Sequence, residues 1–409
     1  MKPDKTSGIG GALSLLTIPA FLRIWTIGGL IGIARWLEML AIGIYIFDVT
    51  QSPLQVTLFT MLRMLPLALF GMFAGTIADR FSHRLVLALG LAGMTATTLV
   101  LGALALGGNL ALWHIAVGAV LAGIFWSTDY PTRRNMLGVS AGRERIAAAV
   151  GLDAAANTAT KAIGPAAGGA LLALLGMKGV YFLGAALYGL SACLLIGVAV
   201  AGTGRAAASF WRGIGQAIAM VRRDRPLMSA LAITIIFNVW GFPYTAMIAV
   251  IGRDDLALGP TDVGLLICAE GIGGLIATLT IAFLARPWMH RRIYVYGLAL
   301  CLTMMIAFAA VADPILAGIA VLIAGIGAGC FASMQSTIIL LSAPPEQRGQ
   351  ILGLLVVCIG SGPVGFLHLG LLAHWLGAAE AVMVIAVEGM IALAIAWLIW
   401  PETTKEDRR

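Results

Sequence analysis

The sequence predicts an all-α membrane protein with twelve transmembrane helices, arranged as two pseudo-symmetric six-helix halves. Hydrophobic residues make up 60% of its 409 residues and charged residues only 11%, whereas an ordinary globular protein has about 25% charged residues. The apolar residues form runs of about 20, the length that crosses the hydrocarbon core of a bilayer. The 51 glycines suit the close approach of membrane helices. Too few charges remain to cover a soluble surface.

The spans divide into two sets of six around a polar segment. The first set is predicted over residues 24–47, 54–77, 85–106, 110–128, 148–175 and 180–201. The second set is predicted over residues 227–251, 263–285, 293–312, 315–341, 351–376 and 381–400. The predicted domains are therefore residues 1–201, a cytoplasmic linker at 202–226, and residues 227–409 with a short cytoplasmic tail.

The linker carries apolar residues at helical spacing beside Trp211 and several arginines, namely Phe210, Ile214, Ile218 and Val221. This pattern predicts either a short amphipathic helix on the inner leaflet or a solvated connection.

Lysine and arginine in the short loops predict the orientation, because cytoplasmic loops retain them. Of the 26 basic residues, 21 lie on one side, whereas the other side carries only Lys178 and Arg253. We therefore expect a multi-pass protein of the inner (plasma) membrane with both termini in the cytoplasm. The net charge of +7 does not indicate nucleic-acid binding, since the bases are spread over loops rather than gathered on one face.

Two features recur in the halves at similar offsets, which is typical of transporters built from repeats. Arg80 and Arg286 lie in basic loops after the second span of each half, 206 residues apart. A Gly-Pro pair occurs in the fifth and in the eleventh span, at 164–165 and 362–363, 198 residues apart. The sequence therefore predicts a duplicated six-helix unit.

Residues 75–84 read G-T-I-A-D-R-F-S-H-R, and over essentially its whole length the chain resembles the major facilitator superfamily. In that family this loop is an inner gate, a role that the resemblance implies for Asp79, Arg80 and Arg84; the alternative is a simple topology anchor. The second-half counterpart at 285–291 keeps the bases but lacks the aspartate.

Finer motifs resemble the drug:proton antiporter group that contains the enterobactin exporter. They include Arg63-x-x-Pro66, Asp129-x-Pro131-x-Arg133 in a predicted loop between spans four and five, and Gly-Pro-x-x-Gly-Gly at 164–169. The resemblance implies gating or conformational roles for Gly75, Asp79, Arg80, Arg84, Asp129, Arg133, Gly164, Pro165, Gly168, Gly362 and Pro363. The Gly164-Pro165 pair is also expected to kink its helix.

Ionisable residues at bilayer depth are costly and mark pathways or proton relays. Glu38, Glu270 and Asp153 are therefore the candidates for proton coupling. Arg35 precedes Glu38 by three residues, so both lie on one helix face and could form an ion pair. The family resemblance implies that this helix lines the central cavity; a static pair that only fixes packing is the alternative.

The candidates for the substrate cavity are polar or aromatic residues inside the spans: Arg35, Arg63, Asn157, Lys161, Asn238, Trp240, Tyr244 and Gln335. Asp153, Asn157 and Lys161 form a stripe that faces either the cavity or the opposing half, or is a structural polar seam. Arg63 either contacts substrate or forms an inter-helix hydrogen bond. His368 is expected to be solvated, and Glu388 to lie outside the cavity.

These features predict a secondary active transporter with alternating access, which exports an amphipathic, drug-like or siderophore-like molecule in exchange for protons. Uptake or facilitated transport of a polar or anionic solute is the alternative, and a membrane enzyme or sensor is a remote one. No catalytic residues, no metal and no cofactor are expected, and one polypeptide is expected to be a complete unit. The fold alone does not define the substrate or the direction of transport.

Overall fold

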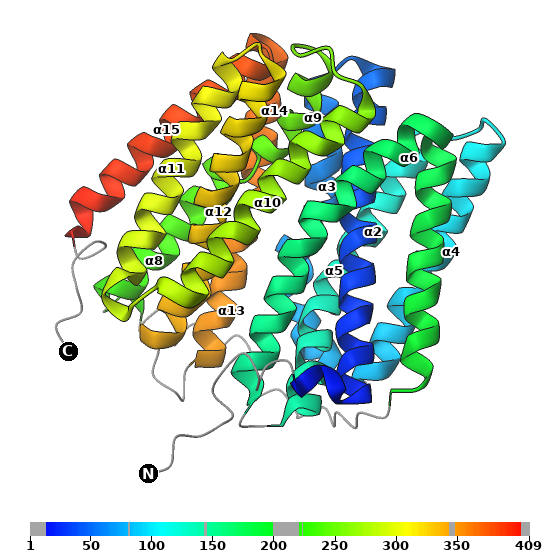
Figure 1. Ribbon diagram of the computed structural model, residues 1–409, viewed down its shortest axis with the longest axis horizontal. Coiled ribbons are helices and arrows are strands. Elements are labelled where there is room, and N and C mark those ends of the chain that lie inside the picture. Colours follow the sequence, from blue (N-terminus) through cyan, green and yellow to red (C-terminus); the bar gives the residue numbers. More distant parts are fainter. Residues whose placement is uncertain are drawn as a thin grey trace.

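The computed structural model describes residues 14–80, 82–142, 145–198, 221–222, 224–342 and 348–401. Within these ranges the regular structure is helical throughout, and two groups of long helices lie side by side (Figure 1). The N-terminal group comprises η1 (Ser14–Thr17), α2 (Pro19–Thr50), α3 (Pro53–Arg80), α4 (His83–Leu106), α5 (Leu112–Ala141) and α6 (Ile146–Ile196).

The C-terminal group begins after the linker. It comprises α8 (Arg225–Ile236), the π-helix η3 (Phe237–Gly241), α9 (Tyr244–Arg253), α10 (Pro260–Leu284), η4 (Pro287–Met289), α11 (His290–Ala310), α12 (Pro314–Ser342), α13 (Arg348–Ile359), α14 (Gly362–Leu376) and α15 (Ala378–Ile399). The amphipathic helix predicted in the linker falls almost entirely outside the described residues.

The predicted all-helical membrane architecture is confirmed, with three departures in how the spans are cut. Ten helices of the described chain are long and apolar enough to cross a membrane. The fifth and sixth predicted spans form the single helix α6, bent at Gly176, whose φ of 65° suits glycine. The seventh span is interrupted by η3, and the eleventh is broken between α13 and α14, where Pro363 stands in the first turn of α14.

One predicted boundary is wrong. The fourth span was expected to end at residue 128, with Asp129 and Arg133 in a loop, but α5 continues to Ala141 and buries both side chains. Hydropathy falls here because the helix carries charges, not because it stops. The charges find partners on neighbouring helices, which makes their burial tolerable. The Gly164-Pro165 pair likewise leaves α6 continuous, and the described bend lies at Gly176 instead.

Arginines at the start of a helix cap the end of the last helix in the same group. Arg23 donates to the Gly197 carbonyl at 2.6 Å, and Arg225 donates to the Ile399 carbonyl at 2.8 Å. A guanidinium near a helix C-terminus meets both the free carbonyls and the negative end of the dipole. The two caps are offset by 202 residues at both ends, which is the repetition that a duplicated unit would produce.

The two groups contact each other through two equivalent helix pairs, α6 with α10 and α3 with α14. Glycines allow the backbones to approach: a methyl group at position 264 would lie 2.7 Å from the Pro165 carbonyl oxygen. In the other pair, Gly370 lies directly against the side chain of Thr57. Small residues permit this contact without a hydrophobic driving force between helices.

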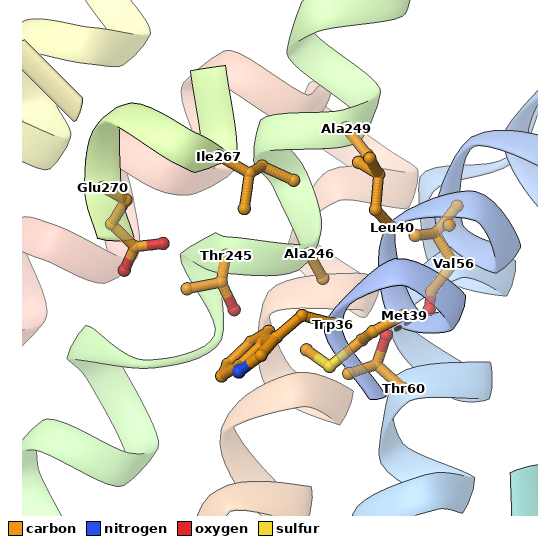
Figure 2. Close-up of a pocket in the computed structure, with 11 residues that line it drawn as sticks. Trp36, Met39, Leu40, Val56, Thr60, Thr245, Ala246, Ala249, Ile267 and Glu270 are labelled. Atoms are coloured by element: carbon orange, nitrogen blue, oxygen red, sulfur yellow. Dashed lines mark hydrogen bonds between the residues drawn. The ribbon is translucent and has the colours of Figure 1, made fainter. Parts of the chain in front are cut away.

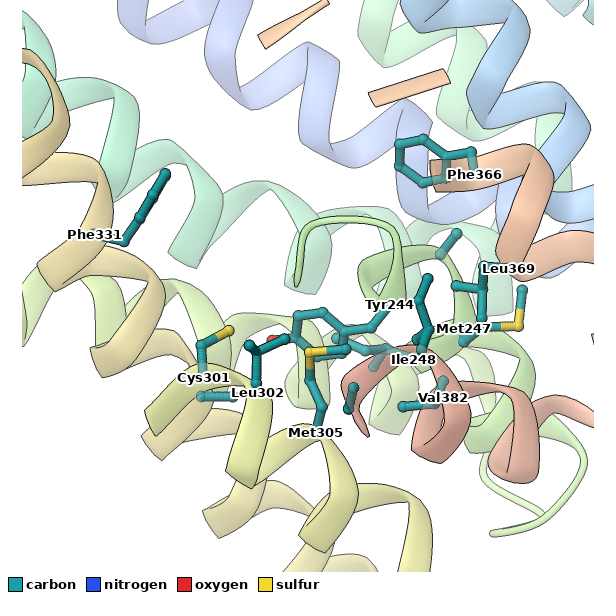
Figure 3. Packing of buried hydrophobic residues seen from close by; sticks show 14 of the residues in the cluster. Tyr244, Met247, Ile248, Cys301, Leu302, Met305, Phe331, Phe366, Leu369 and Val382 are labelled. Carbon is teal, nitrogen blue, oxygen red and sulfur yellow. The ribbon is translucent and has the colours of Figure 1, made fainter. Parts of the chain in front are cut away.

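The largest buried cluster joins the groups near one end of the molecule. It contains Ile44 and Val56 from the N-terminal group and Met247 and Phe366 from the C-terminal group. Figure 3 shows Tyr244 and Met247 of α9 packed among residues of α11, α14 and α15. A second cluster, in the opposite half of α2–α6, is built from the N-terminal group alone. Packing between the groups is therefore concentrated toward the end that the loop charges predict to face outward.

Candidate functional site

A pocket lies between the two groups where α2 and α3 meet α9 and α10 (Figure 2). It has about 420 Å³ of space, including its opening to solvent. Its lining residues are apolar except for two threonines, one tryptophan N–H and one carboxylate: Trp36, Met39, Leu40, Gly43, Val56, Thr60, Thr245, Ala246, Ala249, Ile267 and Glu270. A mostly apolar pocket with a few polar groups is typical of a small-molecule site.

Glu270 is the charged residue of this lining, and it pairs across the two groups. Its Oε1 lies 2.7 Å from Nζ of Lys161 on α6. The ammonium group of Lys161 also lies 5.2 Å from the centre of the Trp36 ring, a favourable cation–π position. The other oxygen of Glu270 has no hydrogen-bond partner, although the Tyr244 hydroxyl faces the carboxylate. One oxygen of this buried carboxylate is thus free to take a proton.

Trp36 supplies an unused donor to the same pocket. Its indole nitrogen is buried and has no hydrogen-bond partner in the described structure, whereas the hydroxyls of Thr60 and Thr245 donate to carbonyls of their own chain segments. A buried donor without an acceptor is unfavourable. A bound molecule with an acceptor oxygen or nitrogen would satisfy it.

The remaining predicted charges form a network inside the N-terminal group. Arg35 lies 3.5 Å from Asp129, which lies 3.5 Å from Arg133. Arg133 forms an ion pair with Asp153, and Arg134 lies 3.2 Å from the same carboxylate. Asp153 and Asp129 therefore hold α2, α5 and α6 together through charge-assisted contacts.

The predicted ion pair between Arg35 and Glu38 is not formed. Both side chains do lie on one face of α2, but Glu38 pairs with Arg63 of α3 at 3.3 Å while Arg35 turns to Asp129. Arg35 also lies 4.7 Å from the Trp126 ring. Arg63 thus makes the inter-helix bond that the sequence offered as one alternative. The stripe of Asp153, Asn157 and Lys161 is likewise divided, since only Lys161 is paired with the opposing group.

Several predicted cavity residues have partners away from the pocket. Asn238 donates to the Thr234 carbonyl, and Gln335 donates to the Thr234 hydroxyl. Asn157 is exposed and does not line the pocket. The Trp240 indole N–H donates to Glu388, which also lies 2.7 Å from His368; His368 is therefore paired, contrary to the solvated state expected for it.

The residues expected to gate or bend the molecule fall into two sets. The side chains of Gly75, Asp79 and Arg80 lie outside the described residues, and Arg84 donates to the Ile196 carbonyl at the end of α6. The second set lies at helix contacts: Gly164 and Gly168 pack on α2, Pro165 faces α10, and Gly362 and Pro363 begin α14.

Sequence reasoning missed Trp36, Thr60 and Thr245. A signal for Trp36 was present, because residues 36, 39, 40 and 43 recur at helical spacing on one face of α2, while Arg35 and Glu38 lie on another. Apolar residues at this spacing are as common in packing faces, so the pattern by itself does not indicate a site.

The sequence was compared with known families and proteins. The profile of the Major Facilitator Superfamily matches residues 24–366, with a further match over residues 244–409. The chain belongs to the Major Facilitator Superfamily. It is a membrane transporter, not an enzyme.

Similar curated proteins include efflux pumps. The multidrug efflux pump Tap of Mycobacterium tuberculosis is 28% identical over 357 residues, which cover 81% of this chain and 83% of the pump. The tetracenomycin C resistance and export protein of Streptomyces glaucescens is 32% identical over 120 residues, 29% of this chain and 21% of that protein. An uncharacterized MFS-type transporter of Bacillus subtilis, YfiS, is 29% identical over 161 residues, 39% of this chain and only 37% of that relative.

Solved transporters share the fold at low identity. The nucleoside transporter NupG has a TM-score of 0.71 at 12% identity, covering 93% of this chain and 100% of that one. A bacterial homologue of the lysosomal transporter Spinster has a TM-score of 0.72 at 16% identity, covering 95% and 98%. The chain is thus a secondary transporter of this superfamily, distantly related to drug efflux pumps.

Proposed function

We propose that this transporter exports an amphipathic small molecule in exchange for protons, and that the pocket between the two groups binds the molecule. The observation that carries the proposal is Glu270, a buried carboxylate that lines an apolar pocket and pairs with Lys161 of the opposing group at 2.7 Å. The relatives named as efflux pumps support the direction of transport.

The pocket favours a substrate with an apolar body and a hydrogen-bond acceptor. Met39, Leu40 and Ile267 offer apolar surface, whose burial contributes roughly 25 cal/mol per Å². The free indole N–H of Trp36 requires an acceptor. The substrate would therefore match an uncharged or cationic drug-like molecule better than a small polar solute.

Protonation of Glu270 couples this pocket to the movement of the groups. A neutral Glu270 no longer attracts Lys161, so the contact between α6 and α10 weakens, and the state in which these helices separate becomes more populated. A substrate that occupies the pocket competes with the same state. Exchange follows if either the proton or the substrate, but not both, is carried through each transition.

The gate at the opposite end is part of this proposal. The expected inner gate of Asp79, Arg80 and Arg84 would close the predicted cytoplasmic end when the outer contacts open. Uptake of an anionic solute is the weaker candidate, because Arg35, Arg63 and Lys161 each have a carboxylate partner and so leave no free cation to attract an anion.

Efflux from everted membrane vesicles tests the proposal. A panel of dyes, antibiotics and siderophores is offered with an imposed proton gradient, with and without a protonophore. We expect protonophore-sensitive transport of at least one compound, reduced more than tenfold by Glu270→Gln. Glu388→Gln is the matched control, since it changes another span carboxylate that lies outside the pocket, and it should retain transport.

Two results would contradict the proposal. Gradient-driven transport that persists in Glu270→Gln would remove this residue from coupling. Transport that ignores the protonophore in the unaltered protein would remove protons altogether.

A further inference from the structure

A second, smaller cavity lies wholly inside the N-terminal group. It has about 250 Å³ of space between atoms of α2, α3, α4, α5 and α6. Residues of the C-terminal group do not contribute to its lining, which is Glu38, Ile42, Arg63, Met94, Thr97, Thr98, Leu101, Ile115, Gly118, Ala119 and Tyr181. The side of α2 that lines it is not the side that carries Trp36 and Leu40 into the pocket between the groups.

Three buried polar atoms in this lining have no hydrogen-bond partner: Oε1 of Glu38, Nε of Arg63 and the hydroxyl of Tyr181. Glu38 is 3% exposed and Arg63 is 5% exposed. Their mutual ion pair uses Oε2 of Glu38 and one terminal nitrogen of Arg63, so it leaves these atoms unsatisfied. A buried polar group without a partner is unfavourable by a few kcal/mol, and one such group is usually explained by ordered water.

Water fits this cavity in both number and kind of partners. A buried water molecule makes about three hydrogen bonds, and the cavity offers an acceptor in Glu38, a donor in Arg63 and a hydroxyl in Tyr181. The threonine hydroxyl of Thr98 is already bonded to the Met94 carbonyl at 2.8 Å. A metal cation fits poorly, because the Arg63 guanidinium occupies the same site.

The charged and titratable groups around Glu38 are few. Arg63 faces it from α3, Arg35 from α2 itself, and Tyr181 and Tyr188 from α6. The cavity lining from α4 and α5 is uncharged. A proton that reaches Glu38 through water would therefore change the charge balance of the Arg63 pair without a substrate being present.

We propose that Glu38 is a proton-binding site separate from the substrate pocket, in which a bound water bridges its free carboxylate oxygen to Tyr181 and Arg63. The inference deepens the proposed proton exchange: Glu270 competes with the substrate inside the pocket, whereas Glu38 responds to pH alone. Protonation of Glu38 releases Arg63 and so loosens α2 from α3, the two N-terminal helices that border the pocket.

The test needs no substrate. The purified full-length protein is reconstituted in liposomes, and infrared difference spectra are recorded over a pH titration to follow the C=O stretch of protonated carboxyl groups. We expect one titrating band to vanish in Glu38→Gln and to persist in Glu270→Gln. Tyr181→Phe should shift its pH midpoint upward by roughly one unit, the effect of losing a hydrogen bond to the charged form.

Thr98→Val is the matched control, because Thr98 lines the same cavity but its hydroxyl is already bonded to its own helix. This variant should leave the midpoint unchanged. If Glu38→Gln fails to fold, Tyr181→Phe carries the test, since it alters no charge.

A band that survives Glu38→Gln, or a midpoint that Tyr181→Phe leaves in place, would overturn the inference. A midpoint that moves equally in Tyr181→Phe and Thr98→Val would overturn the bridging water. These outcomes are independent of the export assay, so the failure of the proposed function and the failure of this site can be told apart.

Discussion

At the scale of single residues, the buried charges are defined by partners on other helices. Arg35, Glu38, Arg63 and Asp129 each pair with a residue from a different element. Such pairs are weak evidence of stability as pairs, but removing one member leaves its partner charged and buried. Asp129 is the most sensitive point, because two arginines converge on it and it is 1% exposed.

We expect Asp129→Asn to lower the free energy of unfolding by about 3 kcal/mol, the range found when one member of a buried pair is lost. Thermal unfolding in detergent, followed by the fluorescence of a thiol-reactive dye, measures the change. Asp254→Asn, at an exposed aspartate after α9, is the control and should leave the melting temperature nearly unchanged. An equal effect of the two substitutions would show that the network does not stabilise the fold.

At the scale of helices, the contact between the groups depends on glycines that lack a side chain where two backbones meet. Gly264 of α10 approaches the Pro165 carbonyl of α6, and this contact lies beside the pair of Lys161 and Glu270. Helix spacing and coupling therefore share one interface. A change in spacing should alter the ion pair even though neither charge is removed.

Gly264→Ala should push α6 and α10 apart and lower stability by about 1–3 kcal/mol, as overpacked sites do, with a loss of transport of at least several-fold. Gly93→Ala provides the comparison, because a methyl group there meets no atom within 4 Å. Vesicle transport and thermal unfolding are measured for both variants. Normal transport in Gly264→Ala would mean that this contact does not restrict the movement.

At the scale of the whole molecule, the two groups are joined at one end by a shared core and by the contact of Arg253 with Asp48 at 2.9 Å. This ion pair is partly exposed, so it adds little stability by itself. It marks the place where the groups must separate if the pocket is to open toward the predicted outer face.

A covalent link at this point should arrest transport. In the double variant Asp48→Cys/Arg253→Cys, a short bifunctional thiol reagent is expected to reduce transport more than tenfold, and a reagent that reductant cleaves should allow recovery. Each single variant treated in the same way controls for the native cysteines, of which Cys193 is exposed. Full transport in the linked protein would show that this end does not open.

The sequence by itself determined the all-helical membrane fold and the approximate place of the spans. Both depend on local properties, since about 20 apolar residues suffice to cross a bilayer and every backbone group must be satisfied inside it. It also placed Glu38, Arg63, Lys161 and Glu270 at membrane depth. Helical periodicity correctly put Arg35 and Glu38 on one face of α2.

Only the tertiary structure decided what that face meets. Glu38 was expected to line the central cavity, but it faces a cavity within the N-terminal group, and the pocket receives Trp36 instead. Lys161 and Glu270 are 109 residues apart and become partners because α6 packs on α10. Spacing along one helix fixes which residues share a face, whereas the choice of ionic partner depends on distances between helices that no local pattern contains.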